Sequence, residues 1–173
     1  ERFAQYCLDA MLTEHLDPAT NLFIELLAPD TSRFNDTQGN EVMPGHSAQA
    51  CKALMDEALR KQDRTLLLQA VDILKAHYEA GWDPELGGTF YLIDIRNGQP
   101  TDDNKNAWQQ IEFMVGLLHA FEHTGADWAS KYYGDVHRWA FEKHPDPEYG
   151  LWHQLADRQG RAPETNTTRD FYH

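Results

Sequence analysis

The fold is decided by residues 83–91, whose sequence reads DPELGGTFY. Two other stretches have the same shape, DPATNLF at residues 17–23 and DPEYGLW at residues 146–152, so the three aspartates lie 66 and 63 residues apart. In each copy the proline fixes a turn, and the aromatic residues that follow favour a short strand; in two copies a glycine supplies the positive φ that a tight turn needs. Because each copy follows a helical stretch, we interpret the chain as an internal repeat.

Helices of two kinds are expected between these turns. Residues 63–80 and 127–143 carry apolar side chains on one face and charged side chains on the other, a pattern typical of a half-exposed outer helix, and residues 2–16 show it more weakly. Residues 106–124 are apolar on every side, which predicts an inner helix. Residues 46–60 are poor in charge over their first two turns and are expected to form the other inner helix. Inner and outer helices therefore alternate in hairpins of about 64 residues.

Helical hairpins that stack at this period form either an open solenoid or a closed toroid. A toroid of six hairpins needs roughly 390 residues at this period. The chain has 173, opens directly on a helical pattern and stops at His173. We therefore expect residues 1–173 to be one partial domain, all-α with short β-hairpins, and a fragment of a longer protein.

The charge of the chain argues against several classes of partner. Its 28 acidic and 15 basic residues give a net charge of −13, whereas nucleic acids and anionic membranes attract basic surfaces. No run of roughly 18 apolar residues, the minimum for a membrane-spanning helix, is present. Cys7 and Cys51 are too few for a disulfide framework or a zinc set. We expect a soluble cytoplasmic protein with no nucleic-acid and no membrane partner.

The repeat also brings polar residues to equivalent positions. His46 opens the first inner helix, Gln110 and Glu112 lie in the first turns of the second, and His173 stands where a third would begin. The intervals from 46 to 110 and from 110 to 173 are 64 and 63 residues. Because equivalent positions in a toroid point toward the same mouth, we expect these side chains to converge on one pocket. Helix N-termini at that mouth favour anionic or oxyanionic groups.

Each of these residues also has a structural interpretation. His46 follows a Pro-Gly turn and is either a helix-start residue or a general acid–base group, since histidine titrates near neutral pH. Glu112 is either a site carboxylate or half of a structural ion pair. Trp108 is either a core residue or a platform for a sugar ring. His119 and His123 lie four residues apart on one helix face, but two ligands are too few, and we expect no metal site.

Four segments, in this order, resemble one family. They are residues 44–50 (PGHSAQA), 87–91 (GGTFY), 105–112 (KNAWQQIE) and 171–173 (FYH). Together they are similar to the C-terminal half of the N-acylglucosamine 2-epimerase family, which includes cellobiose 2-epimerases and aldose–ketose isomerases. The resemblance covers nearly the whole chain. It implies that residues 1–173 are roughly the C-terminal half of an (α/α)6 barrel that holds a sugar in its central cavity.

The resemblance also implies roles for individual residues. The family's two acid–base histidines fall on His46 and His173, and Glu112 either binds sugar hydroxyls or tunes a histidine. Substrate-binding positions fall on Gln49, Trp108, Gln110 and Trp152. The implied reaction removes the C2 proton of an open-chain sugar to give a cis-enediol(ate), then returns a proton to C2 or to C1, without metal or cofactor. Whether the protein forms a homodimer is left open.

The sequence departs from the family pattern at two positions. Gln49 stands where the family usually has glutamate; it can hydrogen-bond a hydroxyl but carries no charge. Ala107 replaces the first tryptophan of an aromatic pair. Two alternatives therefore stay open. One is a toroid that binds a sugar or a protein without catalysis. The other is a glycoside hydrolase in which Glu112 pairs with a loop acid, Asp102 or Asp103.

Overall fold

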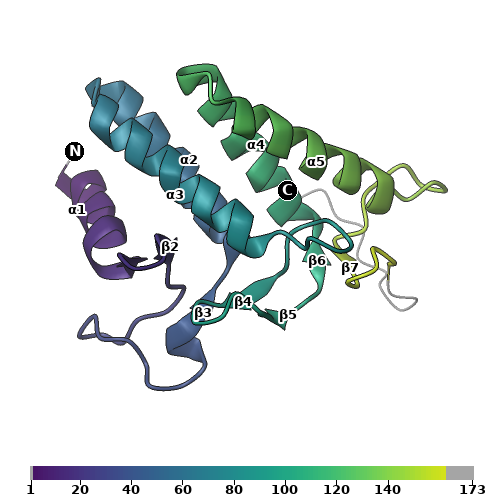
Figure 1. The fold of residues 1–173 in the computed structure, drawn as a ribbon, viewed down its shortest axis with the longest axis horizontal. Coiled ribbons are helices and arrows are strands. Elements are labelled where there is room, and N and C mark those ends of the chain that lie inside the picture. The colour runs from purple at the N-terminus through teal and green to yellow at the C-terminus, as the bar shows by residue number, and fades with distance from the viewer. Residues whose placement is uncertain (1, 163–173) are drawn as a thin grey trace.

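The computed structural model describes residues 2–162, which form α-helices joined by turns and short strands (Figure 1). The helices are α1 (Arg2–Ala10), α2 (Pro44–Lys61), α3 (Arg64–Gly81), α4 (Ala107–Thr124) and α5 (Asp127–Lys143). A π-helical turn, Met11–His15, follows α1, and a 3-10 turn, Gln38–Asn40, precedes α2. The predicted helices agree with these bounds within a few residues, except that the α-helix expected over residues 2–16 ends at Ala10.

The helices alternate between inner and outer positions, as the sequence predicts. The long helix α2 packs against both α3 and α4, and α4 packs against α5 (Figure 1). Their shared core is made of aliphatic and aromatic side chains that include Leu54, Met55, Leu74, Phe113, Leu117 and Val136. Asp63 starts α3 by accepting a hydrogen bond from the backbone N–H of Leu66 at 3.0 Å. Among the described residues, no helix is both long and apolar enough to cross a membrane.

The all-round apolar pattern of α4 is only partly buried within residues 2–162. Phe113 and Leu117 are fully buried against α2 and its neighbours. On another side of the helix, Val115, Leu118 and Phe121 are 41%, 51% and 39% exposed. These three side chains follow one another at helical spacing, so they form a continuous apolar stripe. We call them the α4 stripe.

The three Asp-Pro copies fold into the same turn. In each, one carboxylate oxygen of the aspartate accepts hydrogen bonds from the backbone N–H groups two and three residues later, at 2.8 to 3.2 Å; the aspartates are Asp17, Asp83 and Asp146. The residue four positions on donates its N–H to the aspartate carbonyl and has a positive φ: Asn21 (60°), Gly87 (73°) and Gly150 (73°). The first copy therefore uses asparagine, which tolerates this conformation, where the others use glycine.

Short antiparallel strands gather at one end of the helices (Figure 1). They are β1 (Leu16–Asp17) with β2 (Leu22–Phe23), β3 (Glu41–Val42) with β4 (Leu92–Asp94) and β5 (Pro100–Asp102), and β6 (Lys105–Asn106) with β7 (Leu155–Ala156). A second apolar core packs here, built from Leu22, Ile24, Val42, Phe90, Ile93 and Ile95. β3 leads into α2 and β6 leads into α4, so two of these small sheets position the first turns of the inner helices.

A buried histidine and a buried ion pair connect the chain segments at this end of the helices. The ring of His77 accepts a hydrogen bond from the N–H of Phe23 at 2.9 Å and bonds the carbonyl of Ile73 at 2.9 Å, and burial lowers its pKa to about 4. Lys105 and Asp83 are both fully buried and form an ion pair at 3.0 Å. Burial would raise the pKa of Asp83, but hydrogen bonds from Arg158 and Lys105 outweigh it and lower that pKa. The ion pair therefore connects the second Asp-Pro turn, through Asp83, to strand β6, through Lys105.

Candidate functional site

The first turns of α2 and α4 are in direct contact. Pro44 occupies the first position of α2, where its fixed φ suits a helix and no N–H is needed. At Gly45 a Cβ atom would lie 2.9 Å from Cζ3 of Trp108 and closer still to Cγ of Gln109, so only glycine lets the two helices approach this far. The approach places the ring of His46 5.1 Å from that of Trp108, tilted by 38°.

His46 is paired with a carboxylate from an earlier segment. Its Nδ1 lies 2.8 Å from Oε1 of Glu25, which follows β2. The hydrogen bond to Glu25 is the main cause that raises the pKa of His46; burial opposes it, and the charges of Glu25 and Glu112 add to it. With Nδ1 donating to the carboxylate, Nε2 is the ring nitrogen that takes up or releases a proton. The side chain of His46 is half exposed, so it is open to a substrate.

Glu112 and Gln49 extend the same group of side chains. Gln49 lies one turn after His46 on α2, and its amide donates to Oε1 of Glu112 at 3.2 Å. Glu112 in turn lies one turn after Trp108 on α4. We call Glu25, His46, Gln49, Trp108 and Glu112 the His46 cluster. It combines an acid–base group, two carboxylates, an amide and an aromatic face, which are the groups that a polyol with a carbonyl requires.

The repeat pattern does not point to Glu25, because this residue lies outside the starts of the inner helices. The available signal was a single acid within the apolar run LFIELL at residues 22–27, directly after the first turn. A carboxylate in such a run needs a partner. The sequence did not reveal that the partner is His46, because 21 residues separate the two.

The structure does not bring Gln110 into the cluster. Its amide is fully buried, accepts from the N–H of Thr89 at 3.2 Å and donates to Oγ1 of Thr89 at 2.8 Å. The side chain of Gln110 therefore stabilises the end of the second Asp-Pro turn, at Thr89, and does not face the His46 cluster.

Trp152 also lies in a turn, the third of the repeat. It stacks on His144 with ring centroids 5.8 Å apart and meets the edge of Phe141 at 4.9 Å. His173 lies outside the described residues.

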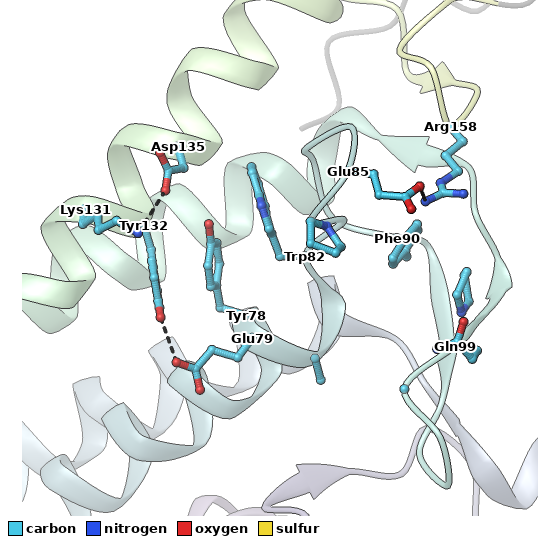
Figure 2. A pocket seen from close by; sticks show the side chains of 14 residues that line it. Tyr78, Glu79, Trp82, Glu85, Phe90, Gln99, Lys131, Tyr132, Asp135 and Arg158 are labelled. Atoms are coloured by element: carbon cyan, nitrogen blue, oxygen red, sulfur yellow. Dashed lines mark hydrogen bonds and ion pairs between the residues drawn. The ribbon is translucent and has the colours of Figure 1, made fainter.

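A hollow of about 150 Å³ lies beside His46 and is also lined by Glu25, Phe23 and Ala50. A larger hollow, of about 590 Å³, lies on the outer wall between α3 and α5. Figure 2 shows its row of rings, Tyr78, Trp82 and Tyr132.

Two carboxylates of the outer hollow already have hydrogen-bond partners. Glu85 pairs with Arg158 at 2.9 Å, and Glu79 accepts from the hydroxyl of Tyr132 at 2.7 Å (Figure 2). The outer hollow is the larger of the two, but the hollow beside His46 is the one lined by a histidine–carboxylate pair that can perform acid–base chemistry. We therefore place the candidate site at the His46 cluster.

The family model described as N-acylglucosamine 2-epimerase (GlcNAc 2-epimerase) matches residues 2–173. The N-acylglucosamine 2-epimerase of Mus musculus is 29% identical over 164 residues, which cover 92% of this chain and 39% of that protein. The chain thus spans about two fifths of the length of this relative.

Two solved structures share the fold. The cellobiose 2-epimerase from Bacillus thermoamylovorans B4167 has a TM-score of 0.76 at 15% identity, covering 94% of this chain and 43% of that chain. A D-mannose isomerase has a TM-score of 0.67 at 22% identity, covering 72% of this chain and 32% of that chain. The described residues are therefore part of an (α/α)6 toroid, as the motifs implied. With its four motifs in order and a family match over nearly its whole length, the chain belongs to the N-acylglucosamine 2-epimerase family.

Proposed function

We propose that the complete protein is a sugar epimerase or aldose–ketose isomerase that moves a proton at C2 of an open-chain sugar. Membership of the family supports this class of reaction. The observation that carries the proposal is the pair of His46 and Glu25, whose 2.8 Å contact orients an exposed imidazole at the first turn of an inner helix. Such a histidine can act as acid or base near neutral pH.

In the proposed reaction one base removes the C2 proton. The electrons of that C–H bond form the C1–C2 double bond, and the carbonyl oxygen takes a proton, which gives a cis-enediol(ate). Return of a proton to the opposite face of C2, with loss of the C1 hydroxyl proton, gives the epimer. In a sugar with a hydroxyl at C2, return of a proton to C1, with loss of the C2 hydroxyl proton, gives the ketose. His46 serves as one acid–base group, and we propose His173 as the other, from the family resemblance.

The other residues are proposed to bind the sugar. Gln49 and Glu112, already joined at 3.2 Å, offer an amide and a carboxylate to sugar hydroxyls. Trp108, tilted against His46, offers an apolar ring face to the pyranose. For Trp152 a place in the sugar site stays a proposal from the resemblance. Gln110 is proposed to act indirectly, because its amide is bound to Thr89.

Two observations bear on the alternative functions, a glycoside hydrolase and a binding protein without catalysis. For hydrolysis, Asp102, the last residue of β5, is already engaged, since it accepts hydrogen bonds from the backbone and side chain of Asn104 at 3.0 and 2.7 Å. For binding without catalysis, Gln49 in place of the family glutamate is the favouring feature. However, His46 keeps a carboxylate partner in Glu25, so the acid–base pair does not depend on position 49.

The test follows the C2 proton by NMR in deuterated water. The complete protein is incubated with N-acetylmannosamine, mannose and cellobiose; the names of the relatives favour the N-acyl sugar. We expect loss of the C2 proton signal of one sugar together with appearance of its epimer or ketose.

The variant His46→Ala should slow this exchange by about 10²-fold or more. His137→Ala, which removes an exposed histidine of α5, should leave the exchange rate unchanged. Exchange at the wild-type rate in His46→Ala would remove His46 from the mechanism. Folded wild-type protein that exchanges no sugar would favour the binding role.

We also propose a cytoplasmic location and a small-molecule sugar as partner. The acidic charge of the chain, −13, supports the absence of a nucleic-acid partner. A homodimer is testable by light scattering of the complete protein.

A further inference from the structure

A second cluster of titratable side chains lies in the last turns of α4, away from the His46 cluster. His119, Glu122 and His123 occupy positions i, i+3 and i+4, which share one helix face. One possible ligand atom from each side chain lies within 4.8 Å of the other two. The two imidazole rings are 4.5 Å apart. Glu112 and Glu122 are separated by roughly 15 Å along the helix axis, so the two clusters are distinct sites.

The neighbouring inner helix adds a carboxylate to this cluster. Oδ1 of Asp56 on α2 lies 3.0 Å from Nε2 of His119, while its other oxygen pairs with Lys52. A histidine that ligates a metal through one ring nitrogen usually donates the other N–H to a carboxylate, which fixes its orientation. The 3.0 Å contact does not have hydrogen-bond geometry, so Asp56 would provide this support after a small reorientation of the ring, with the metal at Nδ1 of His119.

We propose that His119, Glu122 and His123 form a binding site for a divalent transition metal of the zinc type, with Asp56 as a positioning residue. Two imidazole nitrogens and one carboxylate suit Zn²⁺, Co²⁺ or Ni²⁺, whereas Mg²⁺ prefers oxygen ligands. The proposal departs from the expectation of no metal, which counted only the two histidines and did not include the carboxylates of Glu122 and Asp56.

The test is calorimetric titration of the complete, untagged protein with Zn²⁺ after dialysis against a chelator. We expect one Zn²⁺ per chain at this site and much weaker binding of Mg²⁺. His123→Ala and Glu122→Gln, which alter partly exposed side chains, should each weaken Zn²⁺ binding at least about tenfold, and Asp56→Asn should weaken it by about tenfold.

His137→Ala is the matched control, since it removes a histidine that also has an aromatic neighbour on a helix but lies outside the cluster. It should leave Zn²⁺ binding unchanged. The absence of Zn²⁺ binding by the wild type, equal affinity for Mg²⁺, or unchanged Zn²⁺ affinity in His123→Ala would each overturn the proposal. Because the readout is binding, its outcome is independent of the epimerase activity.

Discussion

At the scale of single residues, the contact of 2.8 Å between His46 and Glu25 determines how the site titrates. The carboxylate stabilises the protonated ring and so raises the pKa of His46. A base must be deprotonated to act, so under the proposed mechanism this pKa would set the pH at which activity rises on the acidic side of the profile.

Glu25→Gln should therefore move that acidic limb to lower pH. Glutamine still offers an oxygen to Nδ1 but removes the charge, so the pKa of His46 falls toward its ordinary value of about 6.5. We also expect kcat to fall about tenfold or more, because the ring is held less firmly. The measurement is the pH dependence of kcat/KM in the complete protein. An acidic limb at the same pH in Glu25→Gln would show that another group controls it.

At the scale of elements, the three Asp turns share one backbone geometry but differ in the partners of their aspartates. Asp83 is fully buried with Lys105 and also bonds Arg158 at 2.8 Å. Asp17 pairs with Arg33, whose side chain is 41% exposed. Removing a carboxylate leaves its cation either buried or free to enter water, and these two outcomes have very different costs.

Asp83→Ala should destabilise the complete protein by about 3–5 kcal/mol, because it leaves Lys105 charged and buried without its carboxylate. Asp17→Ala should cost about 1–2 kcal/mol, from the lost turn hydrogen bonds. The measurement is the free energy of unfolding in urea at pH 7. Replacing the cation as well, in Asp83→Ala/Lys105→Met, should recover part of the loss. Equal losses in the two single variants would contradict the distinction between the turns.

At the scale of the whole molecule, the α4 stripe is an apolar surface of an inner helix that residues 2–162 leave uncovered. An (α/α)6 toroid places each inner helix between two others, and α2 covers only one side of α4. We therefore expect further inner helices of the complete protein to cover Val115, Leu118 and Phe121.

Leu118→Glu should lower the free energy of unfolding of the complete protein by about 2 kcal/mol or more, since it places a charge in an apolar contact. Leu68→Glu is the matched control, because Leu68 lies on the outer helix α3 and is exposed to a similar degree, 43% against 51%. It should change the stability by no more than about 0.5 kcal/mol. Similar losses in both variants would mean that the stripe is not an inner surface.

The sequence by itself determined the elements and the family. The period of apolar residues predicted α2 to α5 within a few residues, and the Asp-Pro pattern predicted the three turns, because helical periodicity and turn chemistry depend on neighbours in the chain. The motifs around His46, Trp108 and Glu112 identified the family for the same reason: each is a short local pattern.

The tertiary structure alone decided which side chains meet. Glu25 reaches His46 across 21 residues, Asp56 on α2 reaches His119 on α4, and Gln110, one turn after Asn106, faces Thr89 instead of the cluster. These pairings depend on the close approach of α2 to α4 at Gly45 and on the strands that lead into both helices. Contacts of this kind have no period in the sequence, because they are set by packing between distant segments.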